Sequence, residues 1–223
     1  ESLKQIVFET LNFDVPLVAV ENNIYSLELF HGPTLAFKDV GARFMSRLLG
    51  YFIKKQGLKD VNVLVATSGD TGSAVANGFL GVEGIKVFVL YPKDKVSKIQ
   101  ECQFTTLGKN ITALEIDGTF DDCQRLVKTA FLDADLNKKL QLTSANSINV
   151  ARFLPQSFYY FYAYAQLKKM GKDLDDVVIC VPSGNFGNIT AGLIAKKMGL
   201  PVKRFIAANN KNDIFLQYLQ TGV

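Results

Sequence analysis

The stretch that decides the fold lies at residues 177–199 and reads VVICVPSGNFGNITAGLIAKKMG. A β-branched run over 177–181 enters a turn of serine, glycine and asparagine, and a run with helical composition then continues to Gly199. A strand, a glycine-rich turn and a helix in this order present free backbone N–H groups at the positive end of the helix. The stretch therefore predicts an anion-binding turn, although the turn contains no lysine of its own.

A second stretch repeats this plan earlier in the chain. Residues 61–79 read VNVLVATSGDTGSAVANGF and again place a strand before a Ser-Gly-Asp-x-Gly turn and a helix. Ser-Gly-Asn or Ser-Gly-Asp is also ordinary turn and helix-cap chemistry, so one such turn alone carries little weight. The pair indicates either two sheets that face a common cleft, or a cofactor and a substrate held by different turns.

The hydrophobic pattern along the chain alternates between short β-rich runs and longer segments with helical spacing. Strands are expected at 24–30, 61–66, 86–91, 112–116, 140–144, 177–181 and 202–208. Helices are expected near 40–56, 72–81, 95–107, 120–134, 150–169, 187–198 and 212–220. This order predicts an α/β fold with two largely parallel sheets flanked by helices, and ligands at the carboxyl ends of the strands. The aromatic helix within 150–169 is apolar nearly all round, which predicts burial between layers.

Composition narrows the class of protein. The chain has 223 residues, 48% of them hydrophobic and 21% charged, which is enough for a sizeable core. It has no apolar run long enough to cross a bilayer and no signal-peptide pattern at its start, so no membrane partner is expected. The net charge of +4 is modest, and the basic residues form no stripe with interleaved aromatics. Nucleic acid is therefore an unfavoured partner, and small anionic ligands suit the mild positive charge better.

The cysteine and histidine counts exclude further classes. Cys102, Cys123 and Cys180 show no metal-ligand spacing, and three thiols cannot all pair, which is typical of a reduced, cytoplasmic protein. His31 is the single histidine, so a histidine-rich metal site is excluded and no metal is expected. The sequence also lacks a P-loop and a Gly-x-Gly-x-x-Gly fingerprint.

Lys38 is the candidate nucleophile. It follows the turn HGPT (31–34) and two apolar residues, Ala36 and Phe37, just before a predicted helix for which Asp39 is the expected N-cap. Burial in such a corner lowers the pKa of an amine and makes it more nucleophilic, whereas the alternative is a surface lysine after a turn. A nucleophilic lysine together with a phosphate cradle elsewhere in the chain suits one cofactor, pyridoxal phosphate.

Four motifs carry a family resemblance. They are HGPTLAFKD (31–39), ATSGDTG (66–72), SANSIN (144–149) and VPSGNFGN (181–188). In this order and spacing they resemble the threonine synthase family, and the resemblance covers essentially the whole chain. TSG-x-TG also occurs in cysteine-synthase-like relatives. The resemblance implies a pyridoxal-phosphate enzyme of the tryptophan-synthase-β-like type, known as fold type II. It also implies a chain truncated at both ends, with the partner of the pyridine nitrogen outside it.

The same resemblance implies a division into parts and a set of site residues. Residues 1–35 would lead into the core, 36–148 would form the smaller α/β domain, and 149–223 would belong to the larger cofactor-binding domain. Lys38 would bind the cofactor aldehyde and move protons. The other cofactor-binding residues would be Ser183, Gly184, Asn185, Phe186, Gly187, Asn188 and Asp70. The substrate-binding residues would be Thr67, Ser68, Asp70, Thr71, Asn146, Ser147, Asn149 and Arg152.

The implied reaction converts O-phospho-L-homoserine and water to L-threonine and phosphate by γ-elimination and β-addition. The alternatives are another lyase of this fold, such as a threonine dehydratase or a cysteine-synthase-like enzyme, or an inactive fragment of the enzyme. Val40 and Ala42 stand where members of the family often carry Phe and Gly, and packing effects alone are expected from both. The oligomeric state stays open between monomer and homodimer.

Overall fold

The computed structural model describes residues 1–58, 60–146, 149–182 and 184–222. The chain divides into two compact units, Glu1–Arg152 and Phe153–Val223, and each is described by itself. No helix among the described residues is both long and apolar enough to cross a membrane.

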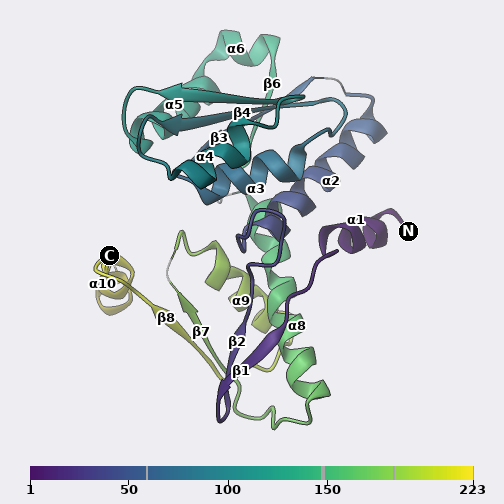
Figure 1. Cartoon of the computed structure of the whole chain (residues 1–223), viewed down its shortest axis with the longest axis vertical. Helices are drawn as coiled ribbons and strands as arrows, with labels where there is room; N and C mark the ends of the chain where they lie inside the picture. The colour runs from purple at the N-terminus through teal and green to yellow at the C-terminus, as the bar shows by residue number, and fades with distance from the viewer. Residues whose placement is uncertain (59, 147–148, 183, 223) are drawn as a thin grey trace. The chain divides into compact units, whose positions relative to one another are not determined.

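A parallel sheet of four strands forms the centre of the first unit, in the order β5-β4-β3-β6 (Figure 1). Its strands are β3 (Val61–Ala66), β4 (Ile85–Pro92), β5 (Ile111–Ile116) and β6 (Gln141–Ser144). In register, Val61 pairs with Ile85 on one side and with Gln141 on the other. Each strand lies within one or two residues of its predicted range, because β-branched residues dominate the runs and polar turns bound them.

Helices cover both faces of this sheet. They are α2 (Asp39–Gln56), α3 (Asp70–Phe79), α4 (Lys98–Thr105) and α5 (Phe120–Leu132), and the short α6 (Ala134–Lys139), which has no buried residue, leads into β6. Alternate residues of a strand point to opposite faces, so Val63 and Val65 pack with residues of α2, α3 and α4. Leu64 and Ala66 pack instead with Cys123 and Val127 of α5. The predicted α/β architecture with helices on both faces is confirmed.

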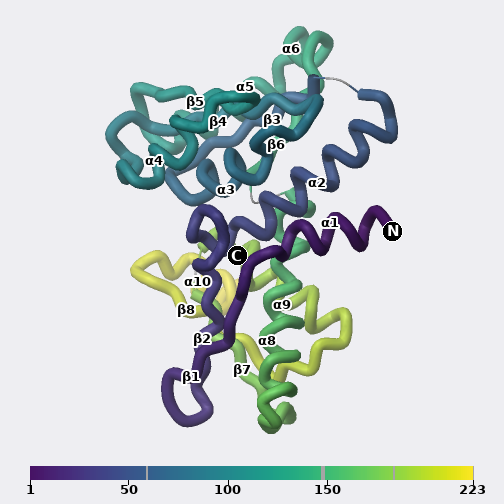
Figure 2. Tube along the Cα trace, turned by 45° about the vertical axis from the view of Figure 1, so that its right-hand side comes forward, coloured from purple at the N-terminus to yellow at the C-terminus, as the bar shows by residue number. Residues whose placement is uncertain are grey.

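The start of the first unit holds elements that the sequence pattern did not predict. They are α1 (Ser2–Thr10) and β1 (Leu17–Glu21), and β1 pairs antiparallel with β2 (Ile24–Leu27). Helix α1 lies along α2 (Figure 2), where the Arg43 guanidinium donates to the carbonyl oxygens of Glu9 and Thr10 at 2.7 and 3.1 Å. Strand β1 escaped prediction because it is short and mostly exposed, so it has little of the burial that makes a strand pattern visible.

The second unit contains a parallel pair of strands, β7 (Val178–Pro182) and β8 (Arg204–Ala208). Its helices are η1 (Leu154–Gln156), α8 (Ser157–Lys169), α9 (Gly187–Lys197) and α10 (Ile214–Thr221). The predicted helix at 150–169 is broken, since α7 (Val150–Phe153) ends before Pro155, which has no N–H for a helical hydrogen bond. The expected burial of the aromatic helix is also wrong. Only one side of α8 packs inward, and Phe161 and Tyr162 on its outer side are 36% and 49% exposed.

The core of the first unit gives a stability prediction. Phe79, at the end of α3, is 0% exposed and belongs to the cluster that joins the helices to the sheet. Phe79→Ala should lower the free energy of unfolding by about 3–5 kcal/mol, because it leaves a cavity the size of an aromatic ring. Urea unfolding followed by circular dichroism measures this change.

The matched control is Phe8→Ala, since Phe8 lies on α1 with 78% of its surface exposed. This variant should change the unfolding free energy by less than about 0.5 kcal/mol. Equal losses in the two variants would contradict the core assigned to Phe79.

Candidate active site

Lys38 occupies the position just before α2, where its backbone is already helical with φ −72°. The turn before it is held by Asp39, whose carboxylate accepts hydrogen bonds from the backbone N–H and the hydroxyl of Thr34 at 3.0 and 2.5 Å. Gly32 is required for this turn, because a Cβ there would lie 2.5 Å from Asp39 Oδ2. The prediction of Asp39 as N-cap is therefore wrong: Asp39 is the first residue of the helix, is buried, and ties the helix back to the turn.

The Lys38 amine lies in a partly dry corner of the first unit. Its side chain is 24% exposed, and Nζ lies 3.6 Å from Asp70 Oδ2. Burial is the main cause that lowers the Lys38 pKa; the Asp70 carboxylate acts in the opposite direction, and the Arg152 guanidinium lowers the pKa further. The predicted desolvation of Lys38 is confirmed, and a larger fraction of this amine is neutral at a given pH than for an exposed lysine.

Asp70 is placed by the turn that follows β3. The Thr67 hydroxyl, buried at 1% exposure, accepts hydrogen bonds from the N–H groups of Gly69 and Gly72 at 3.0 and 2.7 Å and donates to the Gly69 carbonyl at 3.0 Å. Gly69 adopts φ +148°, a conformation that side chains disfavour. Thr67 therefore shapes the turn, Asp70 begins α3, and Ser68 lies exposed at the tip of the turn.

Gln100, on α4, is a site residue that the sequence did not reveal. Its side-chain amide donates a short hydrogen bond to Asp70 Oδ1, while Asp70 Oδ2 faces Lys38. Nothing local marks this glutamine in an amphipathic helix. Only the packing of α4 beside α3, which the strand order dictates, brings it to the turn.

The predicted substrate residues after β6 hold the backbone in this structure. The Asn146 side chain donates to the Ala66 carbonyl at 3.0 Å and accepts from the Ala66 N–H at 3.4 Å. The Asn149 side chain donates to the Ser144 carbonyl and accepts from the Ala151 N–H, both at 3.0 Å. Ser147 lies outside the described residues. The assignment of these residues to substrate stays a prediction.

Arg152 is a fully buried guanidinium, 2% exposed, and it donates to the Ala145 carbonyl. Burial lowers its pKa to about 10, and Asp39 opposes that change, so Arg152 remains a cation at neutral pH. Gly41 of α2 lies directly against the Arg152 backbone, where any Cβ would strike the carbonyl oxygen. Arg152 is therefore a buried positive charge near Lys38, and it contributes to the lowered pKa of that amine.

The glycine-rich turn of the second unit leads from β7 into α9. Phe186 takes the left-handed conformation, φ 58°, and its ring lies 4.4 Å from the ring of Phe215. The Asn188 side chain donates to the Pro182 carbonyl at 3.0 Å, which closes the turn. Helix α9 begins at Gly187, where the predicted range 187–198 begins; its N-cap residue makes no side-chain cap, and the Asn188 side chain accepts from the Ile189 N–H at 2.9 Å. Ser183 lies outside the described residues.

The first two described residues of this turn, Gly184 and Asn185, lie at the surface. A Cβ built at Gly184 would meet no atom within 4 Å. Thr71, the last of the predicted substrate residues, lies half-buried in the first turn of α3 beside Asp70. The structure thus gathers Lys38, Thr67–Thr71 and Arg152 in one unit, and the turn 184–188 in the other.

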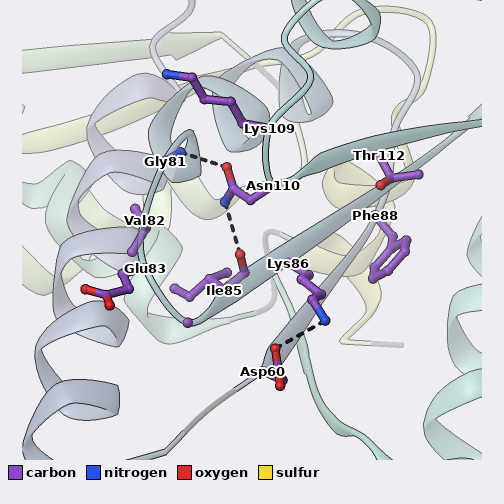
Figure 3. Close-up of a pocket in the computed structure, with 11 residues that line it drawn as sticks. Asp60, Gly81, Val82, Glu83, Ile85, Lys86, Phe88, Lys109, Asn110 and Thr112 are labelled. Atoms are coloured by element: carbon purple, nitrogen blue, oxygen red, sulfur yellow. Dashed lines mark hydrogen bonds and ion pairs between the residues drawn. The ribbon is translucent and has the colours of Figure 1, made fainter.

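A groove of about 560 Å³ lies at the other end of the first sheet, at the amino ends of β3, β4 and β5 (Figure 3). Three of its polar side chains, those of Asn110, Lys86 and Asp60, are engaged in hydrogen bonds or an ion pair. Asn110 binds the Gly81 N–H and the carbonyl of Ile85, and Lys86 pairs with Asp60 at 3.2 Å. Ligands of parallel sheets bind at the carboxyl ends of strands, and there the Lys38 site lies.

Comparison with known proteins connects this site to a family. The sequence profile described as "pyridoxal-phosphate dependent enzyme" matches residues 11–223. The chain belongs to this family. Each unit supplies one of the two features that the cofactor requires: the first holds a desolvated lysine, and the second holds a glycine-rich turn at a helix amino end.

The chain is similar to curated threonine synthases over its whole length. It is 54% identical to the one from Haemophilus influenzae over 221 residues and 53% identical to the one from Escherichia coli over 222 residues. These matches cover 99% and 100% of the chain and 51% of each relative. The chain thus spans about half the length of the curated relatives it matches.

Solved structures of threonine synthases are also similar to this chain. The Escherichia coli threonine synthase superposes with a TM-score of 0.87 at 51% identity, covering 99% of this chain and 50% of that one. The pyridoxal-phosphate-bound threonine synthase from Brucella melitensis gives 0.90 at 42% identity, covering 99% and 48%. A diaminopropionate ammonia lyase from Escherichia coli gives 0.72 at 16% identity, covering 100% and 63%, and that likeness shows the shared fold alone. The predicted fold type is confirmed.

The environment of Lys38 predicts an unusual pH dependence of its reactivity. In competitive acetylation followed by mass spectrometry, the pH midpoint of Lys38 should lie below that of Lys98. Burial lowers the pKa of Lys38, whereas its ion pair with Glu101 raises the pKa of the exposed Lys98. Reactivity follows the neutral amine, so Lys38 should react at the lower pH.

The comparison is internal, because both lysines are labelled in the same sample. The unfolded protein in urea is the control, and there the two midpoints should coincide. A Lys38 midpoint at or above that of Lys98 in the folded protein would contradict the desolvated corner.

Proposed function

We propose that the full-length protein carrying this chain is a threonine synthase, which converts O-phospho-L-homoserine and water to L-threonine and inorganic phosphate with pyridoxal phosphate. The observation that carries this proposal is 54% identity to a curated threonine synthase across 99% of the chain. The site of the first unit supports it, since the family's lysine position holds an amine with a lowered pKa. The free thiols of Cys102, Cys123 and Cys180 support a cytoplasmic location.

The residues present fit pyridoxal phosphate. Lys38 offers a partly exposed amine with a lowered pKa, which suits covalent attachment of an aldehyde. The N-cap residue of α9, Phe186, makes no side-chain cap, the Ile189 N–H is bound by Asn188 Oδ1 at 2.9 Å, and the space at Gly184 is open. We assign the cofactor phosphate to Gly184, Asn185, Phe186, Gly187 and Asn188, with Ser183 as a further donor. Asp70, whose Oδ2 lies 3.6 Å from Lys38 Nζ, is assigned as a further cofactor-binding residue.

Pyridoxal phosphate, when bound, supplies an electron sink for the negative charge that develops on an amino-acid substrate. The protein's own residues then have to bind the substrate and move protons. Lys38 Nζ is the base and acid we assign to proton transfer, because its lowered pKa leaves a larger neutral fraction at a given pH than an exposed lysine has. Asp70, 3.6 Å away, holds the protonated form of the same amine in place.

The substrate's two anionic ends require donors. We assign the turn Thr67, Ser68, Asp70 and Thr71 to its amino-acid end; Ser68 is exposed at the tip, and the Thr67 hydroxyl sets the shape of the turn. We assign Asn146, Ser147, Asn149 and Arg152 to its phosphate. For Arg152 this requires either rotation of the guanidinium or action through its positive charge, because the side chain is 2% exposed.

Two alternatives remain distinct from this proposal. A dehydratase or a cysteine-synthase-like enzyme has the same fold and the same kind of lysine, and relatives at 16% identity do not decide between such reactions. Those enzymes need no donors for a substrate phosphate. Release of phosphate together with threonine therefore separates the classes. The second alternative, that these 223 residues alone are inactive, is tested by assaying the chain beside the full-length protein.

The full-length protein, supplied with pyridoxal phosphate, should form L-threonine and phosphate in equal amounts from O-phospho-L-homoserine. Lys38→Ala should lower this rate by at least about 10³-fold, because it removes the group that moves protons. Amino-acid analysis and a phosphate assay measure the products.

Borohydride reduction followed by peptide mapping provides the control for that experiment, because it should fix the cofactor to the peptide that contains Lys38. Turnover of serine or threonine without phosphate release would support the other lyases. A covalent adduct that persists in Lys38→Ala would refute the assignment of Lys38.

Gly184 tests the phosphate turn. Gly184→Val should weaken pyridoxal phosphate binding by about tenfold or more, because a side chain there would fill the space that a backbone-bound phosphate needs. In the structure a Cβ at Gly184 meets no atom within 4 Å. The unfolding free energy should therefore stay close to that of the wild type. Fluorescence titration with the cofactor and urea unfolding measure the two quantities, and unchanged affinity would move the phosphate elsewhere.

A further inference from the structure

Gln100 links two parts of the first unit that the sequence separates by 30 residues. Its Nε2 donates to Asp70 Oδ1, and the other carboxylate oxygen of Asp70 lies 3.6 Å from Lys38 Nζ. We propose that Gln100 is a positioning residue, which holds the Asp70 carboxylate against the Lys38 amine. The contacts are observed; their value to the enzyme rests on the proposed function, in which Lys38 carries the cofactor.

The orientation of the Gln100 amide follows from the Asp70 carboxylate, which only accepts hydrogen bonds, and Ser97 binds the other end of the amide. The Ser97 hydroxyl donates to Gln100 Oε1 at 3.0 Å, so the opposite end of the amide, with its two N–H bonds, is the end that faces Asp70. The reversed amide would place its oxygen against a carboxylate, which repels it. Ser97 is also the N-cap of α4, where its oxygen accepts the Gln100 backbone N–H. One serine therefore caps the helix and also binds the oxygen end of the amide.

The Gln100 side chain is packed against the turn that carries Asp70. A Cβ at Gly69 would come within 2.8 Å of Gln100 Cδ, so the absence of a side chain at Gly69 makes room for the amide. The buried Ser73 hydroxyl of α3 lies 3.3 Å from the Gln100 carbonyl and 3.4 Å from the Gly69 carbonyl. Backbone and side chain of Gln100 are thus both held on the turn, and the amide has little freedom to leave Asp70.

The position of Asp70 matters because it opposes the other influences on Lys38. The charged groups that face this amine are Asp70, from α3, and Arg152, from α7. Asp70 raises the Lys38 pKa, whereas burial and Arg152 lower it. The Asp70 side chain is 44% exposed, so without an anchor it is free to turn toward water. The Gln100 amide therefore sets how much of the Asp70 charge Lys38 experiences.

The experiment measures the pH midpoint of Lys38 acetylation in the cofactor-free protein, with Gln100→Leu as the variant. This change removes the donor at similar volume, and the midpoint should fall by roughly half a pH unit to one unit. Gln103→Leu is the matched control, because it places the same substitution on the same helix. Within the part of the chain that the structure describes, the Gln103 side chain makes one hydrogen bond, to the Thr34 carbonyl at 3.4 Å, so the Lys38 midpoint should not move in this variant.

A double-mutant cycle tests whether the effect passes through Asp70. Asp70→Asn alone should lower the midpoint, and adding Gln100→Leu to it should change the midpoint by less than about 0.2 units. Two results would overturn the proposal: an unchanged midpoint in Gln100→Leu, or an equal shift in the wild-type and Asp70→Asn backgrounds.

Further controls distinguish a failure of the Gln100 proposal from misfolding of the variant and from failure of the proposed function. If circular dichroism shows that Gln100→Leu does not fold, Gln100→Asn replaces it, since it keeps the amide but shortens its reach by one methylene. That variant should give a smaller fall in the midpoint, and no fall overturns the proposal. The measurement needs no cofactor, so it stands even if borohydride finds the cofactor on another lysine, and that second result alone would count against the proposed function.

Discussion

The site depends on one constraint: the Asp70 carboxylate must stay beside the largely buried Lys38 amine without raising the Lys38 pKa back to that of an exposed lysine. Asp70 meets this constraint because the turn after β3 has a single shape, held by the Thr67 hydroxyl against two backbone N–H groups. The parallel sheet places that turn at the carboxyl end of a central strand, and the start of α2 brings Lys38 to it. The Asp70 carboxylate raises the Lys38 pKa and the Arg152 guanidinium lowers it. Burial is the largest effect, so the net result is a lowered pKa.

Much of this arrangement follows from the sequence alone. The β-branched runs predict the four strands of the first sheet, because their alternation has to place Val63 and Val65 on one face and Leu64 on the other. The turns rich in glycine and serine predict where ligands bind, since such turns follow strands in parallel sheets. Lys38 stood out by its apolar neighbours, and the structure confirms that burial lowers its pKa.

Other features needed the three-dimensional structure. The role of Gln100 depends on the packing of α4 beside α3, and no local pattern marks it. The sequence predicts Asp39 as a helix N-cap, but in the structure its buried carboxylate binds Thr34 and holds the turn. Thr34 comes within hydrogen-bond distance only when the chain folds back on itself. The helix expected at 150–169 is broken at Pro155, and hydrophobic composition alone did not show which side of α8 faces outward.

The Asn146 side chain supplies hydrogen bonds to the backbone of β3 at the point where β6 ends. Beyond Ser144 this side chain offers the Ala66 backbone the same donor and acceptor that another strand residue would offer. In this way a single amide lets β6 stop after four residues while the last residue of β3 stays paired.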